Sequence, residues 1–463
     1  MKINVVCDLQ DRNEYKKRFQ ISEKAVHLSA DAKLGNVSLD IAGIERELGC
    51  KLDSISLDLC EIASYVYLAD KSIARGGFDN WARDLAFLIP VRNPAKWNAV
   101  KQLLRNAIAT LTGDRVQLNF VPAKKVPAAK GAAVTVEKQP AQSGAPESDC
   151  VSLFSGGLDS FAGAVYLLDQ GRSPLFLSHF ASGPLKKLQS RLIDQLRRRY
   201  VHGVEHVQYR LTSRRATNPK LVLKTKESSH RARSFLFMSF AAAVAAGRGI
   251  NEIHICENGV LALNVPISDA RKGSRSTRHA HPLYLQYFAA MIAKLYDREF
   301  LVTNPFLFWT KGAEAALLKE KGFGSSIKHT VSCWGYPNQT IRFGNSNHCG
   351  YCIPCIVRRV SLAASGLEGV DDHYIYDVGK RGARRNEARE RNFSDLVYFC
   401  QSVSNLPSDK LLYRYPEFFL IEAHQGPVMG TKLEKMVRVY KAFAHEVLKF
   451  SSRRSLKPVS PRQ

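Results

Sequence analysis

The feature that most constrains this chain is a strand-like run that passes through a glycine-rich turn into a helix. Residues 151–160 read VSLFSGGLDS, and the sequence continues as the helical run FAGAVYLLDQG. Glycines let the backbone approach an anion closely, and the first N–H groups of a helix attract negative charge. The junction therefore predicts a phosphate site formed by Ser155, Gly156, Gly157, Leu158 and Ser160.

Asp159 lies in the first turn of this helix, where its carboxylate is placed to hold Mg²⁺ against the phosphates. Together with Ser160 it is a predicted catalytic residue. The chain has no Gly-x-x-x-x-Gly-Lys-Ser/Thr motif, so this is not the loop that grips β- and γ-phosphates with a lysine. The alternative is a plain Gly-Gly turn, which would tolerate many residue types at the serines and the aspartate.

Four of the ten cysteines gather in the segment SCWGYPNQTIRFGNSNHCGYCIPC. Cys333, Cys349, Cys352 and Cys355 have the residue type and spacing of a closed, structural, tetrahedral zinc site. The alternatives are His348 in place of one thiolate, an iron–sulfur cluster, and four unligated buried thiols. The other cysteines are scattered and read as apolar filler, so we expect no disulfide framework.

The arrangement of apolar runs predicts how the chain is divided. Short β-rich runs alternate with longer helical runs after residue 150, which is typical of a parallel α/β sheet with crossover helices. The stretch before it is rich in Pro, Ala, Lys and Gly and has no apolar periodicity. We expect a small α+β domain at 1–121, a flexible linker at 122–149, the α/β domain with its zinc knuckle at 150–365, and a basic helical extension at 366–463.

Lys and Arg together exceed Asp and Glu by 25, which favours an anionic partner such as a nucleotide, a nucleic acid or an acidic protein surface. Solubility alone is the alternative explanation of this charge. The longest apolar run, at 239–246, is too short and too rich in alanine to span a bilayer, and the first residues lack the apolar core of a signal peptide. We therefore expect a soluble, cytoplasmic protein.

The strand-Ser-Gly-Gly-x-Asp-Ser-helix junction resembles that of PP-loop ATP pyrophosphatases, and its combination with the cysteine knuckle resembles the QueC family, the 7-cyano-7-deazaguanine synthases. The resemblance covers about residues 151–365 and includes Lys311 and Glu314 of the segment TKGAE at 310–314, which looks like the family's Thr-Lys-x-Glu stretch. It implies an adenine-nucleotide α-hydrolase-like (HUP) parallel sheet, with ATP on the loop and Zn²⁺ on the four cysteines. The implied substrate is 7-carboxy-7-deazaguanine, whose carboxylate is adenylated.

Two segments depart from the shorter housekeeping enzymes of this family, CENGVLALNVP at 256–266 and GSRSTRHAHP at 273–282. They resemble the longer QueC-like proteins of bacterial antiphage operons, the QatC subgroup, in which the activated deazaguanine is joined to the N-terminus of an operon partner. The resemblance implies a protein partner here, which the front domain and the basic C-terminal region would dock.

Glu257, Asn258 and Asn264 are candidate substrate-binding residues, since they follow the strand INEIHIC. Ligands of open α/β sheets bind at the carboxyl ends of the strands, and carboxylate and amide groups suit the donor-rich edge of a guanine-like base. Arg275 or Arg278 would neutralise the substrate carboxylate or the adenylate.

His279 or His281 would accept a proton from the attacking amine, and a structural hydrogen bond or a helix cap before Pro282 is the alternative. Arg231 and Arg233 are candidates for phosphate binding, against the alternative of a solvated helix face.

The resulting hypothesis is an ATP-dependent ligase that forms a C–N bond between a deazaguanine carboxylate and an amine. Asp159, Ser160, Arg278 and His281 would carry the catalysis, Arg233 would contact the nucleotide, and Arg275 would contact the substrate. The alternatives are a synthase that uses ammonia and releases free 7-cyano-7-deazaguanine, a tRNA-modifying PP-loop enzyme, and a non-catalytic nucleotide sensor.

Overall fold

The centre of the molecule is a five-stranded, fully parallel sheet in the order β11-β10-β6-β7-β8. Its strands are β6 (Cys150–Leu153), β7 (Pro174–His179), β8 (Glu205–Tyr209), β10 (Glu252–His254) and β11 (Leu301–Thr303). The chain order reverses between β6 and β10, so the loops that follow these two strands open onto a common crevice. The computed structural model describes residues 2–8, 19, 21, 25–30, 35–75, 82–123, 147–201, 203–213, 223, 227, 229–268, 278–336, 347–371, 373–380, 386–426 and 430–454.

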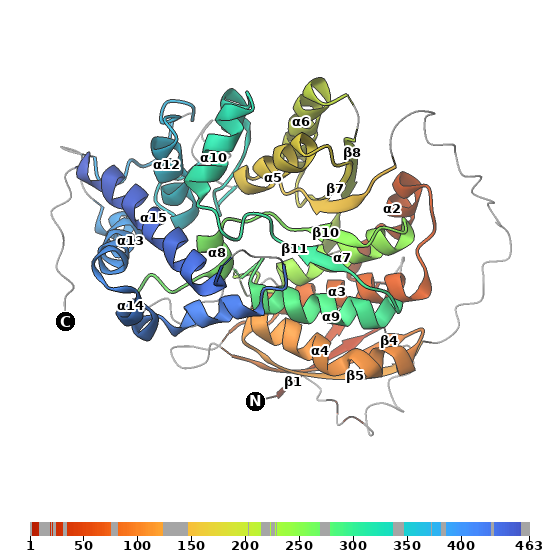
Figure 1. Cartoon of the computed structure of the whole chain (residues 1–463). Coiled ribbons are helices and arrows are strands. Elements are labelled where there is room, and N and C mark those ends of the chain that lie inside the picture. Colours follow the sequence, from red (N-terminus) through yellow and green to blue (C-terminus); the bar gives the residue numbers. More distant parts are fainter. Residues whose placement is uncertain are drawn as a thin grey trace.

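Helices cover both faces of this sheet (Figure 1). α5 (Leu158–Asp169) and α6 (Gly183–Arg199) lie on one face, and α7 (Arg233–Gly247) and α9 (Pro282–Tyr296) lie on the other. α7 is apolar around its circumference and almost entirely buried, which accounts for the alanine-rich run at 239–246. No helix of the described residues is long and apolar enough to cross a membrane.

The front region forms a second parallel sheet, in the order β2-β1-β4-β5. Its strands are β1 (Lys2–Cys7), β2 (Val26–Leu28), β4 (Asp84–Val91) and β5 (Arg115–Pro122), and its helices are α2 (Ile41–Leu48), α3 (Ser54–Ser72) and α4 (Pro94–Thr112). The region thus contains both helices and strands, as expected for residues 1–121. The sheet departs from the α+β expectation because all of its pairings are parallel, whereas α+β folds are usually built on antiparallel sheets.

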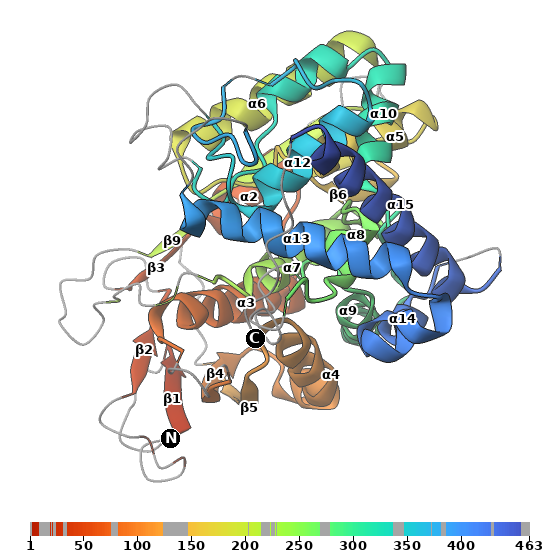
Figure 2. The same ribbon diagram turned by 90° about the vertical axis from the view of Figure 1, so that its left-hand side faces the viewer.

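The two sheets share one layer of helices. Figures 1 and 2 show α3 and α4 packed on α7 and α9, between the front sheet and the central sheet. Their buried apolar side chains belong to one continuous core, and β3 (Val37–Leu39) pairs antiparallel with β9 (Leu211–Ser213) between the two regions. The layer covers a face of each sheet, as parallel sheets require. Most of the predicted linker, residues 124–146, lies outside the described residues.

A buried ionic network connects the front region to the start of α7. Arg75 and Arg83 each bind Asp70 and Asp114, at N–O distances of 2.5–2.9 Å, and all four side chains are buried. Asp70 also accepts a hydrogen bond from the backbone N–H of Ala232, the N-cap residue of α7, at 3.0 Å. The front region therefore fixes the N-terminus of a helix that belongs to the central sheet.

The remaining helices lie around the carboxyl end of the central sheet. They are α8 (Gly259–Leu263), α10 (Lys311–Glu320), η3 (Gly324–His329), α12 (Ile353–Ala364), α13 (Glu387–Asn405), α14 (Ser408–Arg414), η4 (Pro416–Ala423) and α15 (Lys432–Ser452). α13, α14, η4 and α15 lie within 366–463, where the sequence predicted a helical extension. α15 packs against α8, α12 and α13, so the C-terminal region is part of the same body as the central sheet.

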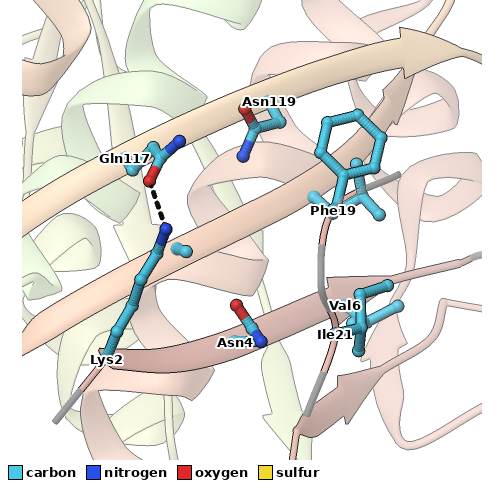
Figure 3. Close-up of a pocket in the computed structure, with 9 residues that line it drawn as sticks. Lys2, Asn4, Val6, Phe19, Ile21, Gln117 and Asn119 are labelled. Carbon is cyan, nitrogen blue, oxygen red and sulfur yellow. Dashed lines mark hydrogen bonds between the residues drawn. The ribbon is translucent and has the colours of Figure 1, made fainter. Parts of the chain in front are cut away.

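A hollow of about 190 Å³ lies on the outer face of the front sheet, on the opposite side of the molecule from α5 (Figures 1 and 3). Lys2 donates a hydrogen bond to Gln117 across it at 2.6 Å, and Phe19 and Ile21 border its far side. It is far from the crevice of the central sheet and contains none of the sequence-predicted site residues.

We predict that Asp70→Ala destabilises the protein strongly. The substitution removes one of the two carboxylates that bind Arg75 and Arg83, together with the acceptor at the N-terminus of α7, and breaking a buried ion pair typically costs about 3–5 kcal/mol. Urea denaturation measures the change. Arg115→Ala, which removes a surface ion pair with Asp84, is the matched control and should cost less than about 1 kcal/mol. Similar losses for the two variants would contradict the prediction.

Candidate active site

The predicted phosphate loop has the backbone geometry of an anion site. Gly156 has φ +83°, a left-handed conformation that favours glycine, and a Cβ atom there would lie 2.7 Å from Leu188 on α6. α5 begins at Leu158, and no side chain of the described residues caps its N-terminus at Gly157. The first N–H groups of α5 therefore remain available to an anion.

Hydroxyl groups line the same loop. Ser155 Oγ lies 3.1 Å from Ser160 Oγ and accepts a hydrogen bond from the N–H of Gly157 at 3.2 Å. Gln189 on α6 donates to the carbonyl of Ser155 at 3.2 Å and so fixes the turn from outside. The loop thus brings two hydroxyls close to the N-terminus of α5, where Ser160 Oγ also donates a hydrogen bond to the carbonyl of Gly157 at 3.0 Å.

Lys311, the first residue of α10, forms a buried ion pair with Asp159. Burial opposes ionisation of Asp159, but the charge of Lys311 and contacts with Glu314 and Asn258 hold the pKa of this carboxyl below its ordinary value. Burial and the charge of Asp159 raise the pKa of Glu314 well above its usual range, so Glu314 is the protonated partner. The first turns of α5 and α10 therefore meet as one charged cluster.

Arg233, Glu257 and His279 form a second polar group beside the loop. Arg233 begins α7, and its guanidinium lies 3.3 Å from His279 Nε2. Burial lowers the pKa of His279 to about 3, so the ring is uncharged near pH 7. Burial and the charge of Asp159 raise the pKa of Glu257 to about 8, and its carboxyl accepts a hydrogen bond from the N–H of Ala280.

These groups share one cavity of about 240 Å³ at the carboxyl end of the central sheet. Its polar side is formed by Ser155, Gly157, Asp159, Arg233, Glu257, Asn264, His279, Lys311 and Ser332. Its apolar side is formed by Leu158, Val260, Leu261, Val265, Pro266, Ile267, Val331, Trp334, Ile353, Pro354, Val357, Leu396, Tyr440 and Phe443. The cavity therefore combines an anion-binding wall with an apolar chamber.

The structure separates the candidates that follow β10. Asn264 lines the cavity as the left-handed C-cap of α8, whereas Asn258 is buried as the N-cap of α8 and contacts Asp159 from behind. The arginine at 275 lies outside the described residues.

The histidines and arginines of the following segment also take different places. His281 is the buried N-cap of α9, and its Nδ1 accepts a hydrogen bond from the N–H of Leu283 at 3.2 Å. His281 and Arg278 are not among the residues that line the cavity, and His279 is. Arg231 is buried and donates to the carbonyl of Thr112 in the front region at 3.0 Å, so it connects α4 to the start of α7.

The C-terminal helix α15 contributes residues that the sequence did not suggest. Tyr440 and Phe443 are buried on the floor of the cavity, and the Tyr440 hydroxyl donates to the carbonyl of Val260 and accepts from the N–H of Val265. Glu446 accepts a hydrogen bond from Thr310, the N-cap residue of α10, at 2.6 Å. α15 therefore holds both ends of the α8 turn and the start of the helix that carries Lys311.

The four predicted metal ligands meet at one point. The Sγ atoms of Cys333, Cys349, Cys352 and Cys355 all lie within 4.8 Å of one another, and all four residues are buried. Tetrahedral zinc with Zn–S bonds of about 2.3 Å places its sulfurs about 3.8 Å apart, close to the 3.9 Å between Cys349 and Cys355. The N–H of Cys352 donates to Cys349 Sγ, as in a metal knuckle.

His348 lies beside this cluster but does not belong to it. Its ring faces Tyr374, and its Nε2 accepts a hydrogen bond from the N–H of Ser332 at 3.4 Å. All ten cysteines are free thiols.

The segment between the cluster and the loop is short and fixed at both ends. The N–H of Val331 donates to the carbonyl of Gly156 at 3.1 Å, and two residues later Cys333 joins the cluster. The position of the cysteine knuckle therefore sets the position of one cavity wall against the phosphate loop.

We predict that Glu446→Gln stabilises the protein at high pH. Burial raises the pKa of Glu446 from its ordinary value of 4.5 to about 7, so the folded protein favours the protonated carboxyl. This contribution to stability is fully present below pH 4.5 and is lost as the pH rises through about 7. Glutamine stays neutral and keeps an acceptor for Thr310. Thermal unfolding should show the variant more stable by up to about 3 kcal/mol at pH 8 and equal to the wild type near pH 4. A difference independent of pH would contradict this.

Comparison with known proteins supports the geometry described here. Residues 149–366, slightly less than half of the chain, match the family model of the queuosine biosynthesis protein QueC. No curated protein matched the chain. The matched residues include the whole central sheet, the phosphate loop and the four cysteines, and a QueC match implies an ATP-using enzyme of the PP-loop type. Residues 149–366 are therefore a QueC-like domain, set between two regions that lie outside the match.

Proposed function

We propose that this protein is an ATP-dependent ligase that adenylates the carboxylate of a 7-deazaguanine and joins it to an amine. The proposal is carried by one observation: the phosphate loop, Lys311, Arg233 and Glu257 line a single cavity at the switch point of the parallel sheet. The strand order also supports the adenine-nucleotide α-hydrolase-like arrangement that the QueC resemblance implies.

The loop side of the cavity would hold the nucleotide. The N-terminus of α5 and the hydroxyls of Ser155 and Ser160 would bind the departing pyrophosphate, while Lys311 and Arg233 would neutralise the charge that develops there. Asp159 fits a Mg²⁺ ligand, because its lowered pKa keeps it ionised beside the loop. Mg²⁺ would supply further charge neutralisation at the phosphates.

The chemistry takes two steps. The substrate carboxylate attacks the α-phosphorus of ATP, forms an acyl adenylate and displaces pyrophosphate. The amine then attacks the acyl carbon, AMP leaves, and the proton of the amine is accepted by a base. Of the two predicted histidines, His279 lines the cavity whereas His281 caps α9 through its Nδ1, and burial and the charge of Arg233 oppose protonation of the His279 ring. Glu257 and Asn264 would bind the polar edge of the base.

The amine is the open part of this function. The segments at 256–266 and 273–282 resemble the QatC subgroup and favour the N-terminus of a partner protein in antiphage defence. Ammonia, with release of the free nitrile, is the alternative. The protein is incubated with Mg·ATP, 7-carboxy-7-deazaguanine and either ammonia or the product of a neighbouring gene, and the products are analysed by mass spectrometry. A mass gain on the partner protein supports the protein amine, and free nitrile supports ammonia. AMP release that depends on RNA alone would instead support a tRNA-modifying enzyme.

We expect that Asp159→Ala abolishes AMP and pyrophosphate release, because Asp159 would hold Mg²⁺, and that Lys311→Met lowers kcat at least about 100-fold, because Lys311 would neutralise the phosphates. Lys319→Met, at an exposed position of the same helix, is the matched control and should retain full activity. The rate of AMP formation from ATP and 7-carboxy-7-deazaguanine measures all three. Full activity of Asp159→Ala would remove the assignment of the loop.

We further propose that the four cysteines hold one structural Zn²⁺ per chain. Metal analysis of purified protein should give one zinc, and Cys352→Ser should lose it together with several degrees of thermal stability, because the metal staples the 331–336 segment to α12. Cys50→Ser, outside the cluster, is the control and should keep the metal. A zinc content that is unchanged in Cys352→Ser would contradict the assignment.

A further inference from the structure

Trp334 is a large aromatic side chain that remains half exposed at the cavity. It lines the cavity, yet 51% of its surface is exposed. The other described tryptophans are packed in aromatic surroundings: Trp97 is fully buried beside Phe120, and Trp309 packs against Phe306 and Tyr166. Exposed aromatic surface beside a polar site is typical of a ligand contact.

The backbone around Trp334 is anchored to the phosphate loop and to the cysteine cluster. The N–H of Val331 is bonded to the carbonyl of Gly156 in the phosphate loop. Cys333 belongs to the cysteine cluster, and its sulfur accepts a hydrogen bond from the N–H of Gly335 at 3.4 Å. The backbone of Trp334 therefore cannot move freely, and a ligand that contacts its indole meets a pre-organised surface.

The surroundings of the indole select the kind of ligand. The loop and Lys311 occupy the anion-binding side of the cavity, whereas Ile353, Pro354 and Val357 of α12 line its apolar side together with Trp334. A ring in contact with this wall gains apolar burial and stacking, and the same cavity is also lined by the polar side chains of Ser332 and Asn264.

We infer that Trp334 is the stacking platform for a planar, purine-like ring bound in this cavity. The inference rests on the function proposed above and names one contact of its ligands. The ring has two possible sources, the adenine of ATP and the deazaguanine itself, and they share the chemistry that an indole recognises.

Intrinsic fluorescence tests the inference without a turnover assay. ATP and 7-carboxy-7-deazaguanine are titrated separately into wild-type protein, Trp334→Phe, Trp334→Ala and the matched control Trp309→Phe, and calorimetry gives Kd for the same four proteins. Phenylalanine keeps a stacking ring but removes the reporter, whereas alanine removes both. Melting temperature and zinc content are measured for each variant, so a folding defect is recognised.

The expected result is that one ligand quenches the fluorescence of the wild type and of Trp309→Phe but not that of Trp334→Phe. Trp334→Ala should weaken the Kd of that ligand about tenfold, while Trp334→Phe changes it less than about threefold. Quenching by ATP identifies adenine as the stacked ring, and quenching by 7-carboxy-7-deazaguanine identifies the deazaguanine ring.

Two results would overturn the inference. If both ligands bind the wild type but Trp334→Ala leaves both Kd values unchanged, the platform is wrong and the proposed function stands. If calorimetry shows that neither ligand binds the wild type, the proposed function fails together with the platform.

Discussion

The burial of two parallel sheets on one shared layer of helices is the constraint on which the rest of the structure depends. Parallel sheets are usually covered by helices, and here α7 and α9 cover one face of the central sheet while α3 and α4 cover the inner face of the front sheet. Because the two pairs pack on each other, the QueC-like domain is enclosed by chain that lies outside the family match. The ionic network at Asp70 fixes this contact at the end of α7 that faces the cavity.

Several helix N-termini converge on the cavity, and each contributes a residue of its first turn. α5 contributes Asp159, α7 contributes Arg233 and α10 contributes Lys311. The partial positive charge at each N-terminus adds to the charges of Arg233 and Lys311, so the field in the cavity favours an anion with several negative charges. This field is consistent with the triphosphate of the proposed function, in which Asp159 would hold the cation.

The sequence predicted local features well and long-range ones poorly. The β6–loop–α5 unit and the cysteine cluster were predicted because the glycines, serines and cysteines that define them lie close together in the chain. Buried parallel strands read as apolar runs, so most of the central sheet was also recognisable. The sequence did not predict the pairing of β3 with β9 or the part of the cavity wall that Tyr440 and Phe443 form, because both depend on residues that are far apart in the chain. The positions of His279 and His281 could not be distinguished, since a turn before α9 decides which ring faces the cavity. Lys311 was noted only through its family stretch, and a lysine at a helix start has no local signal that shows it will be buried.

The hydroxyl of Tyr440 bonds to the carbonyl of Val260 and to the N–H of Val265, one on each side of the end of the short helix α8. This helix follows β10 and is made long before α15 during synthesis of the chain. On a ribosome, the central sheet can therefore assemble while the cavity floor is still missing. The cavity is complete only after α15 has been made and has docked against α8.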